Sequence, residues 1–210
     1  MEFWNDVIVE KSYSLLVKLK GRYDFVLIGG WAVYLYTRSE KSKDIDIIVD
    51  YPELQRIAKE AAIKKNERLK KYEISIEGVS IGIYLPYYSK LALPVEKIME
   101  NVLVIEGFKV PKIEYLLALK QQAELDRKAS VKGMKDRIDI LSLLLSGNVH
   151  LDAYAGILGE HKNEILERLK TITNGLEEYR YLGIADPRKI KKTRKKLRDE
   201  IESMIWAERQ

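Results

Sequence analysis

The chain has 210 residues, of which 46% are hydrophobic, enough apolar surface for one large domain or two small ones. No segment approaches the roughly 18 apolar residues that a membrane span needs, and the first ten residues lack the basic-then-apolar order of a signal peptide. We therefore expect a cytoplasmic protein with no membrane partner. The absence of cysteine excludes disulfides and thiolate metal sites, and with only two histidines any metal ion is expected to bind oxygen.

The charge of the chain favours an anionic partner. Its net charge is +5 and its pI is near 9.1, which suits nucleic acid or a nucleoside triphosphate. Charged residues make up 33% of the chain and are mostly Lys, Glu and Arg, a balance typical of thermophilic proteins.

Up to Val110 the apolar spacing alternates between helical and extended periods. Helical spacing predicts helices over residues 5–20, 31–36 and 52–66. Apolar or alternating runs predict strands over residues 25–28, 43–49, 72–77, 79–85, 102–105 and 108–110. The runs on either side of Gly78 are expected to form a hairpin, and a linker that contains Pro86 and Pro94 is expected before residue 102.

The apolar spacing changes at Pro111. From there the spacing is helical and predicts helices over residues 113–127, 133–145, 151–173 and 187–207, punctuated by glycines. The sequence thus predicts an α/β domain over residues 1–110 and a helical domain over residues 111–210.

The stretch from Phe25 to Asp50 contains the best candidate site. Asp44 and Asp46 are separated by one residue on a predicted strand, so both carboxylates lie on one face and can share a divalent cation such as Mg²⁺ or Mn²⁺. Gly29 and Gly30 end the preceding strand, where a backbone without side chains can approach a phosphate and the following helix start favours an anion.

In this order, these elements resemble the nucleotidyltransferase superfamily related to DNA polymerase beta. The similarity is closest to the branch that contains toxin components of abortive-infection and related toxin–antitoxin systems. In that branch a Ser or Thr and a basic residue precede Asp-x-Asp, as Ser42 and Lys43 do here. The resemblance extends over about the first 145 residues, and its later helical pattern matches Lys120, Arg127 and the stretch 135–139.

The resemblance implies an α+β fold, a mixed β-sheet with flanking helices followed by a helical C-terminal half. It implies Mg²⁺ or Mn²⁺ at Asp44 and Asp46. It also implies a nucleoside triphosphate bound by a set of glycines and short polar or basic side chains: Gly29, Gly30, Ser42, Lys43 and Lys120. The expected reaction moves a nucleoside monophosphate to a hydroxyl on RNA, protein or a small molecule, and an antitoxin is an expected partner.

One position departs from the family pattern. Active members place a third carboxylate on a later strand, and Gly82 stands where it is expected. Glu73 or Glu77 on the neighbouring run could supply the group, and Glu77 is our candidate for it. The alternative function is a catalytically weakened protein of this fold that binds a nucleic acid or a protein partner.

Simpler interpretations remain for several motifs. The two aspartates could be solvated at a strand edge, and the glycine pair could be an ordinary turn. Lys120 could be a surface lysine whose stem covers apolar residues, and Asp136 and Asp139 could form local ion pairs. The basic run 188–198 predicts an amphipathic helix whose outer face is either solvated or in contact with nucleic acid, although it contains no aromatic residue for base stacking.

Overall fold

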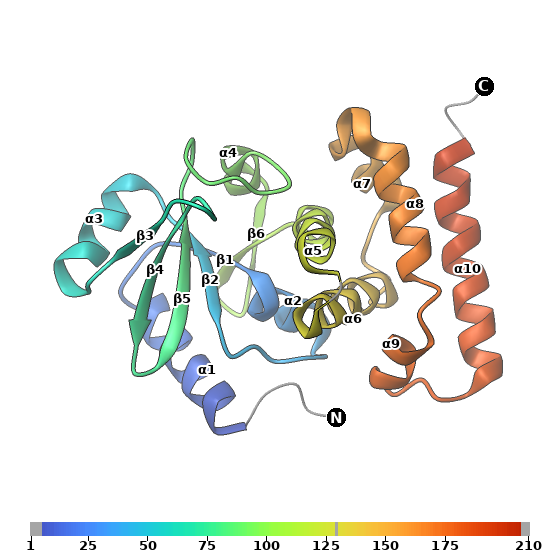
Figure 1. The fold of residues 1–210 in the computed structure, drawn as a ribbon, viewed down its shortest axis with the longest axis horizontal. Helices are drawn as coiled ribbons and strands as arrows, with labels where there is room; N and C mark the ends of the chain where they lie inside the picture. The colour runs from blue at the N-terminus through green and yellow to red at the C-terminus, as the bar shows by residue number, and fades with distance from the viewer. Residues whose placement is uncertain (1–5, 129, 207–210) are drawn as a thin grey trace. The chain divides into compact units, whose positions relative to one another are not determined.

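The computed structural model describes residues 6–128 and 130–206. The chain divides between Lys112 and Ile113 into two compact units, a sheet unit and a helical unit, and together they make an α+β protein (Figure 1). Within the described residues, no helix has the length and apolar character to cross a membrane.

The sheet unit contains four helices and seven strands among its described residues. Its helices are α1 (Asp6–Lys20), α2 (Gly29–Thr37), α3 (Tyr51–Glu60) and α4 (Val95–Glu100). Its strands are β1 (Val26–Ile28), β2 (Ile45–Ile48), β3 (Lys64–Asn66), β4 (Lys71–Ile76), β5 (Val79–Tyr84), β6 (Val102–Ile105) and β7 (Phe108–Pro111).

The seven strands form one mixed sheet in the order β3-β4-β5-β2-β1-β7-β6. β2 runs antiparallel to β1 and parallel to β5, so it lies in the middle of the sheet with a partner on each side. β4 and β5 form the predicted hairpin, and β6 and β7 form another. The strand that carries Asp46 is therefore held by hydrogen bonds along both edges.

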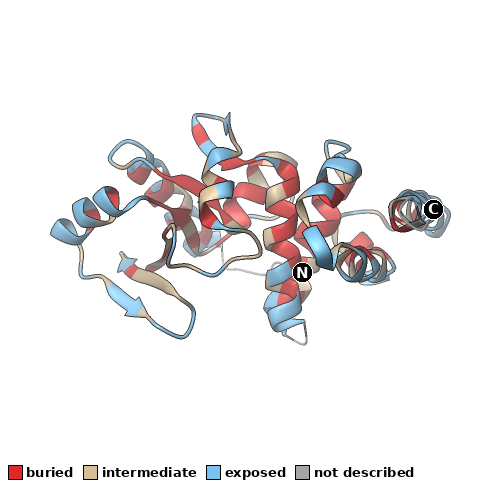
Figure 2. Ribbon diagram, turned by 90° about the horizontal axis from the view of Figure 1, so that it is seen from above, coloured by how far each residue is buried: buried red, intermediate tan, exposed pale blue. Residues whose placement is uncertain are grey.

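The core of this unit lies where apolar strands meet helices. Leu27, Ile45, Ile47, Ile81 and Ile83 are almost completely buried, and the strand register places them side by side on one face of the sheet. Figure 2 shows buried residues, in red, on both strands and helices. α1 and α2 pack against each other, where the Trp31 indole N–H donates to the Ser12 hydroxyl at 2.9 Å. This packing fixes the helix that begins at the glycine pair.

Two sequence predictions in this unit are wrong. The helix expected to reach residue 66 ends at Glu60, and residues 64–66 form the edge strand β3 instead. Pairing with β4 decides this, because a short polar edge strand has no apolar alternation of its own. The segment between Pro86 and Val102, expected to be a linker, contains α4, whose Val95 and Ile98 are buried.

In the helical unit, the described residues form six α-helices and one short 3₁₀ turn. They are α5 (Ile113–Arg127), α6 (Val131–Leu145), α7 (Leu151–Ile157), η1 (Gly159–His161), α8 (Lys162–Ile172), α9 (Leu176–Tyr181) and α10 (Pro187–Trp206). The single helix expected over residues 151–173 is wrong, because it is interrupted at Gly159, whose φ is +62°. α9 was also not predicted.

Candidate functional site

Asp46 lies on the central strand of the sheet, between β1 and β5. On β2 it pairs with Ile28 of β1 on one side and with Gly82 of β5 on the other. Its carboxylate lies between two glycines: a Cβ atom added to Gly29 would come within 2.6 Å of Oδ2, and one added to Gly82 within 2.6 Å of Oδ1. Both glycines therefore make room for this carboxylate.

Gly29 also has a conformation that requires glycine. Its φ is +70°, in the left-handed region where a side chain is strained, and it begins α2 directly after β1. The N-cap position, Ile28, makes no side-chain hydrogen bond to the helix start. The amides at the start of α2 thus lie beside Asp46 without a capping side chain from Ile28, as an anion site at a helix start requires. Gly30, the second glycine of the predicted pair, is buried in the first turn.

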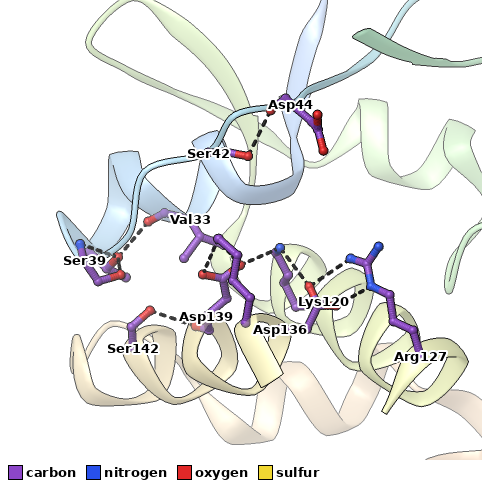
Figure 3. A network of polar contacts seen from close by, with 11 residues as sticks. Val33, Ser39, Ser42, Asp44, Lys120, Arg127, Asp136, Asp139 and Ser142 are labelled. Atoms are coloured by element: carbon purple, nitrogen blue, oxygen red, sulfur yellow. Dashed lines mark hydrogen bonds and ion pairs between the residues drawn. The ribbon is translucent and has the colours of Figure 1, made fainter. Parts of the chain in front are cut away.

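Asp44, Ser42 and Lys43 form the approach to β2. Asp44 stands one residue before the strand, and the buried Ser42 hydroxyl donates to its carbonyl oxygen at 3.0 Å (Figure 3). In this structure Ser42 thus shapes the turn that presents Asp44. Lys43 is half-buried between them. Contact of Ser42 or Lys43 with phosphate stays a prediction.

The position opposite Asp46 is the one where a third carboxylate was expected, and Gly82 occupies it. Of the two alternative glutamates, Glu73 pairs with Gly82 across the β4–β5 hairpin. Glu77 lies instead in the hairpin turn, with a φ of +53°, and its exposed side chain is 3.8 Å from the Lys18 ammonium. The four residues from Gly82 to Gly78 span about 13 Å, so the structure does not bring Glu77 to Asp46.

Two residues that the sequence analysis missed also lie beside Gly82. Lys71 Nζ is 3.4 Å, and the Tyr84 ring 3.5 Å, from the point where a Cβ of residue 82 would lie. Lys71 also forms an ion pair with Glu73 Oε1 at 2.9 Å, and this hydrogen bond lowers the pKa of Glu73 despite partial burial. The sequence does contain a signal for this arrangement: a two-residue turn at Glu77-Gly78 fixes the hairpin register and places residue 73 opposite residue 82.

Asp44 and Asp46 supply oxygen donors of the kind that a divalent cation prefers, and metal binding stays a prediction. Within residues 6–128 and 130–206, no group of three or more acidic or histidine side chains is arranged to hold a metal ion. Mg²⁺ commonly uses one or two protein carboxylates and completes its octahedron with substrate phosphates and water. Asp44 and Asp46 would hold the ion.

The helical unit contains a separate, buried cluster of charges between α5 and α6. Lys120 is only 6% exposed and contacts Asp139 at 2.6 Å and Asp136 at 3.2 Å, and Arg127 Nε donates to Asp136 at 2.6 Å (Figure 3). The interpretation of Lys120 as a surface lysine is therefore wrong. Asp139 also pairs locally with Lys135, as the helical spacing predicted, whereas the partners of Asp136 come from the other helix. A contact of Lys120 with nucleotide stays a prediction.

Mutual pairing keeps this cluster ionised. Burial alone would lower the pKa of Lys120, but the two aspartates outweigh it and raise the pKa above its ordinary value. Burial would likewise raise the pKa of Asp136, but Lys120 and Arg127 hold it below its ordinary value. The cluster thus joins α5 to α6. Removing any one of its charges would leave a partner buried without its opposite charge.

The basic run lies on α10 as predicted. Ile190, Leu197 and Ile201 are buried along one side of the helix, confirming its amphipathic character. Its basic side chains are exposed, except for the half-buried Arg194, which donates to Asn174. Whether this face contacts nucleic acid or only solvent stays a prediction.

No protein-family model and no curated protein sequence matches the chain, but solved structures resemble its fold. The protein JHP933 of Helicobacter pylori superposes with a TM-score of 0.52 at 18% identity, covering 97% of this chain and 94% of that one. A protein from H. pylori described as a "putative nucleotidyltransferase" gives a TM-score of 0.52 at 17% identity and covers 97% of both chains. A Megavirus polyadenylate synthase gives 0.43 at 13% identity over 80% of this chain and 46% of that one. At these identities the two Helicobacter structures show that the chain has a nucleotidyltransferase-like fold.

Proposed function

We propose that the protein is a metal-dependent nucleotidyltransferase that moves a nucleoside monophosphate from a triphosphate to a hydroxyl acceptor. The observation that carries this proposal is the Asp46 carboxylate, held between Gly29 and Gly82 on a central strand, with Asp44 two residues before it and the start of α2 beside it. Central strands rarely carry carboxylates, and this one occupies space that two glycines provide. The fold shared with the H. pylori protein described as a "putative nucleotidyltransferase" supports the same reaction class.

The aspartates would act through electrostatics, and the glycines through the room they leave for the substrate. A divalent cation on Asp44 and Asp46 would neutralise phosphate charge and favour the attack of a hydroxyl. Gly29 and Gly30 let the backbone approach the triphosphate, and the α2 amides donate to its oxygens. In the reaction, the acceptor oxygen forms a bond to the α-phosphorus, pyrophosphate leaves with the electron pair of the broken P–O bond, and the hydroxyl proton passes to water. Positioning and electrostatics supply the catalysis, as is general for phosphoryl transfer.

The test is transfer of α-labelled nucleotide from each of the four triphosphates to RNA, protein and small-molecule acceptors, with Mg²⁺ or Mn²⁺. Replacing both Asp44 and Asp46 by Asn keeps their size and removes the charge, and we expect at least a 10³-fold loss, about 4 kcal/mol of transition-state stabilisation. Asp24→Asn is the matched control, because Asp24 pairs with Lys109 on the surface. Transfer that survives in the double variant would refute the assignment.

A second candidate is a binding protein of the same fold without catalysis. It is favoured by Gly82 opposite Asp46 and by the absence of a cluster of three metal-binding side chains among the described residues. It predicts triphosphate binding that is weak and indifferent to Mg²⁺. Calorimetry that shows tight, Mg²⁺-dependent binding would exclude it.

The biological setting is proposed on the resemblance to toxin–antitoxin nucleotidyltransferases alone. We propose a cytoplasmic toxin that is held inactive by an antitoxin. Expression of the wild-type chain is then expected to arrest growth, and the Asp44→Asn, Asp46→Asn variant to relieve the arrest.

A further inference from the structure

The place of the missing third carboxylate is occupied by a cation. The point where a Cβ atom of residue 82 would lie is 2.6 Å from Asp46 Oδ1 and 3.4 Å from Lys71 Nζ. The carboxylate of β2 and the ammonium of β4 therefore approach the same point from opposite sides, above a residue without a side chain. An aspartate at residue 82 would put a negative charge there, whereas this chain puts a positive charge there.

Lys71 is fixed in this place by its surroundings. Its side chain is only 16% exposed, its ammonium is paired with Glu73 at 2.9 Å, and it lies 5.7 Å from the centroid of the Tyr84 ring. The hydroxyl of the same tyrosine is 3.5 Å from Asp46 Oδ1. Glu73 and Tyr84 thus restrain the charged end of Lys71. A surface lysine would have neither this burial nor two partners from the strands of one sheet.

We propose that Lys71 acts as a fixed cation in place of a second metal ion, so that the Asp44–Asp46 site holds one divalent cation per chain. This inference rests on the proposed nucleotidyl transfer. A second divalent cation between Asp46 and residue 82 would lie within a few ångströms of the ammonium, where like charges repel strongly even at high dielectric constant. The ammonium, held in place by its ion pair with Glu73, would supply a positive charge to the substrate phosphate without a bound ion.

The experiment counts Mn²⁺ ions by electron paramagnetic resonance titration, at saturating concentrations of non-hydrolysable analogues of the four triphosphates. We expect one ion per chain in the wild type. For Lys71→Met alone, titrated without nucleotide, we expect Mn²⁺ to bind about tenfold more tightly, because the ammonium opposite Asp46 no longer repels the ion. Lys59→Met on α3 removes an equal charge from an exposed position and should leave the affinity unchanged.

The outcomes separate this inference from the proposed function. Two ions in the wild type would overturn the role of Lys71 and leave nucleotidyl transfer standing. An unchanged Mn²⁺ affinity in Lys71→Met would also overturn it, provided that circular dichroism shows the variant folded. An ion count in the wild type no higher than in Asp44→Asn, Asp46→Asn would refute the metal site itself, and with it the proposed function.

Discussion

Replacing Gly29 by alanine tests whether this glycine makes room for the Asp46 carboxylate. Two effects are expected. The φ of +70° strains any side chain by about 1–2 kcal/mol. The new methyl group would also lie 2.6 Å from Asp46 Oδ2 and force the carboxylate to move, which costs a further 1–3 kcal/mol or so for overpacking.

Gly78→Ala is the matched control, since it separates strain from crowding. Gly78 lies in the same unit with a φ of +83°, and an added Cβ atom would meet nothing within 4 Å. It should lose only the strain energy of about 1–2 kcal/mol and keep its affinity for Mn²⁺. Gly29→Ala should lose about 2–5 kcal/mol of unfolding free energy and bind Mn²⁺ more weakly.

Urea unfolding measures the stability, with the fluorescence of Trp31 as the probe. Trp31 is 1% exposed on α2, two residues from Gly29. Replacing Trp4 and Trp206 by Phe makes Trp31 the only tryptophan that contributes to the fluorescence. Mn²⁺ titration measures the site. Equal losses of stability in the two alanine variants, with equal Mn²⁺ affinities, would show that Gly29 does not shape the site.

Two further predictions concern the buried charges of the helical unit. Lys120→Met leaves Asp139 without one of its two lysines, and we expect a loss of about 3–5 kcal/mol of unfolding free energy. Urea unfolding followed by far-ultraviolet circular dichroism measures it, and a loss below 1 kcal/mol or so would contradict the described pairing. The lowered pKa of Asp136 stabilises the folded state above its unfolded pKa of about 4, and this stability is lost as pH falls through the folded pKa. Between pH 6 and pH 2 the Tm of thermal unfolding should therefore fall less steeply in Asp136→Asn than in the wild type. Parallel curves of Tm against pH would refute this reasoning.

Local patterns in the sequence predicted many of the elements. The period-two runs on either side of Gly78 predicted the β4–β5 hairpin, and the helical spacing after Pro111 predicted α5 with its observed limits. These signals succeed because each element buries one face, and burial imposes its period on the chain. β3 gave no such signal, since an edge strand with exposed lysines is defined by its partner strand.

The sequence by itself determined which residues could bind a metal ion and phosphate: Asp44, Asp46 and the glycine pair follow from spacing along single elements. Only the tertiary structure decided what stands opposite them. The pairing of β2 with β5 placed Gly82 across from Asp46, and the pairing of β4 with β5 brought Lys71 to the same point and left Glu77 in a distant turn. Residues on three strands meet there through hydrogen-bonded register, and register is a relation between segments that the spacing within any one of them cannot specify.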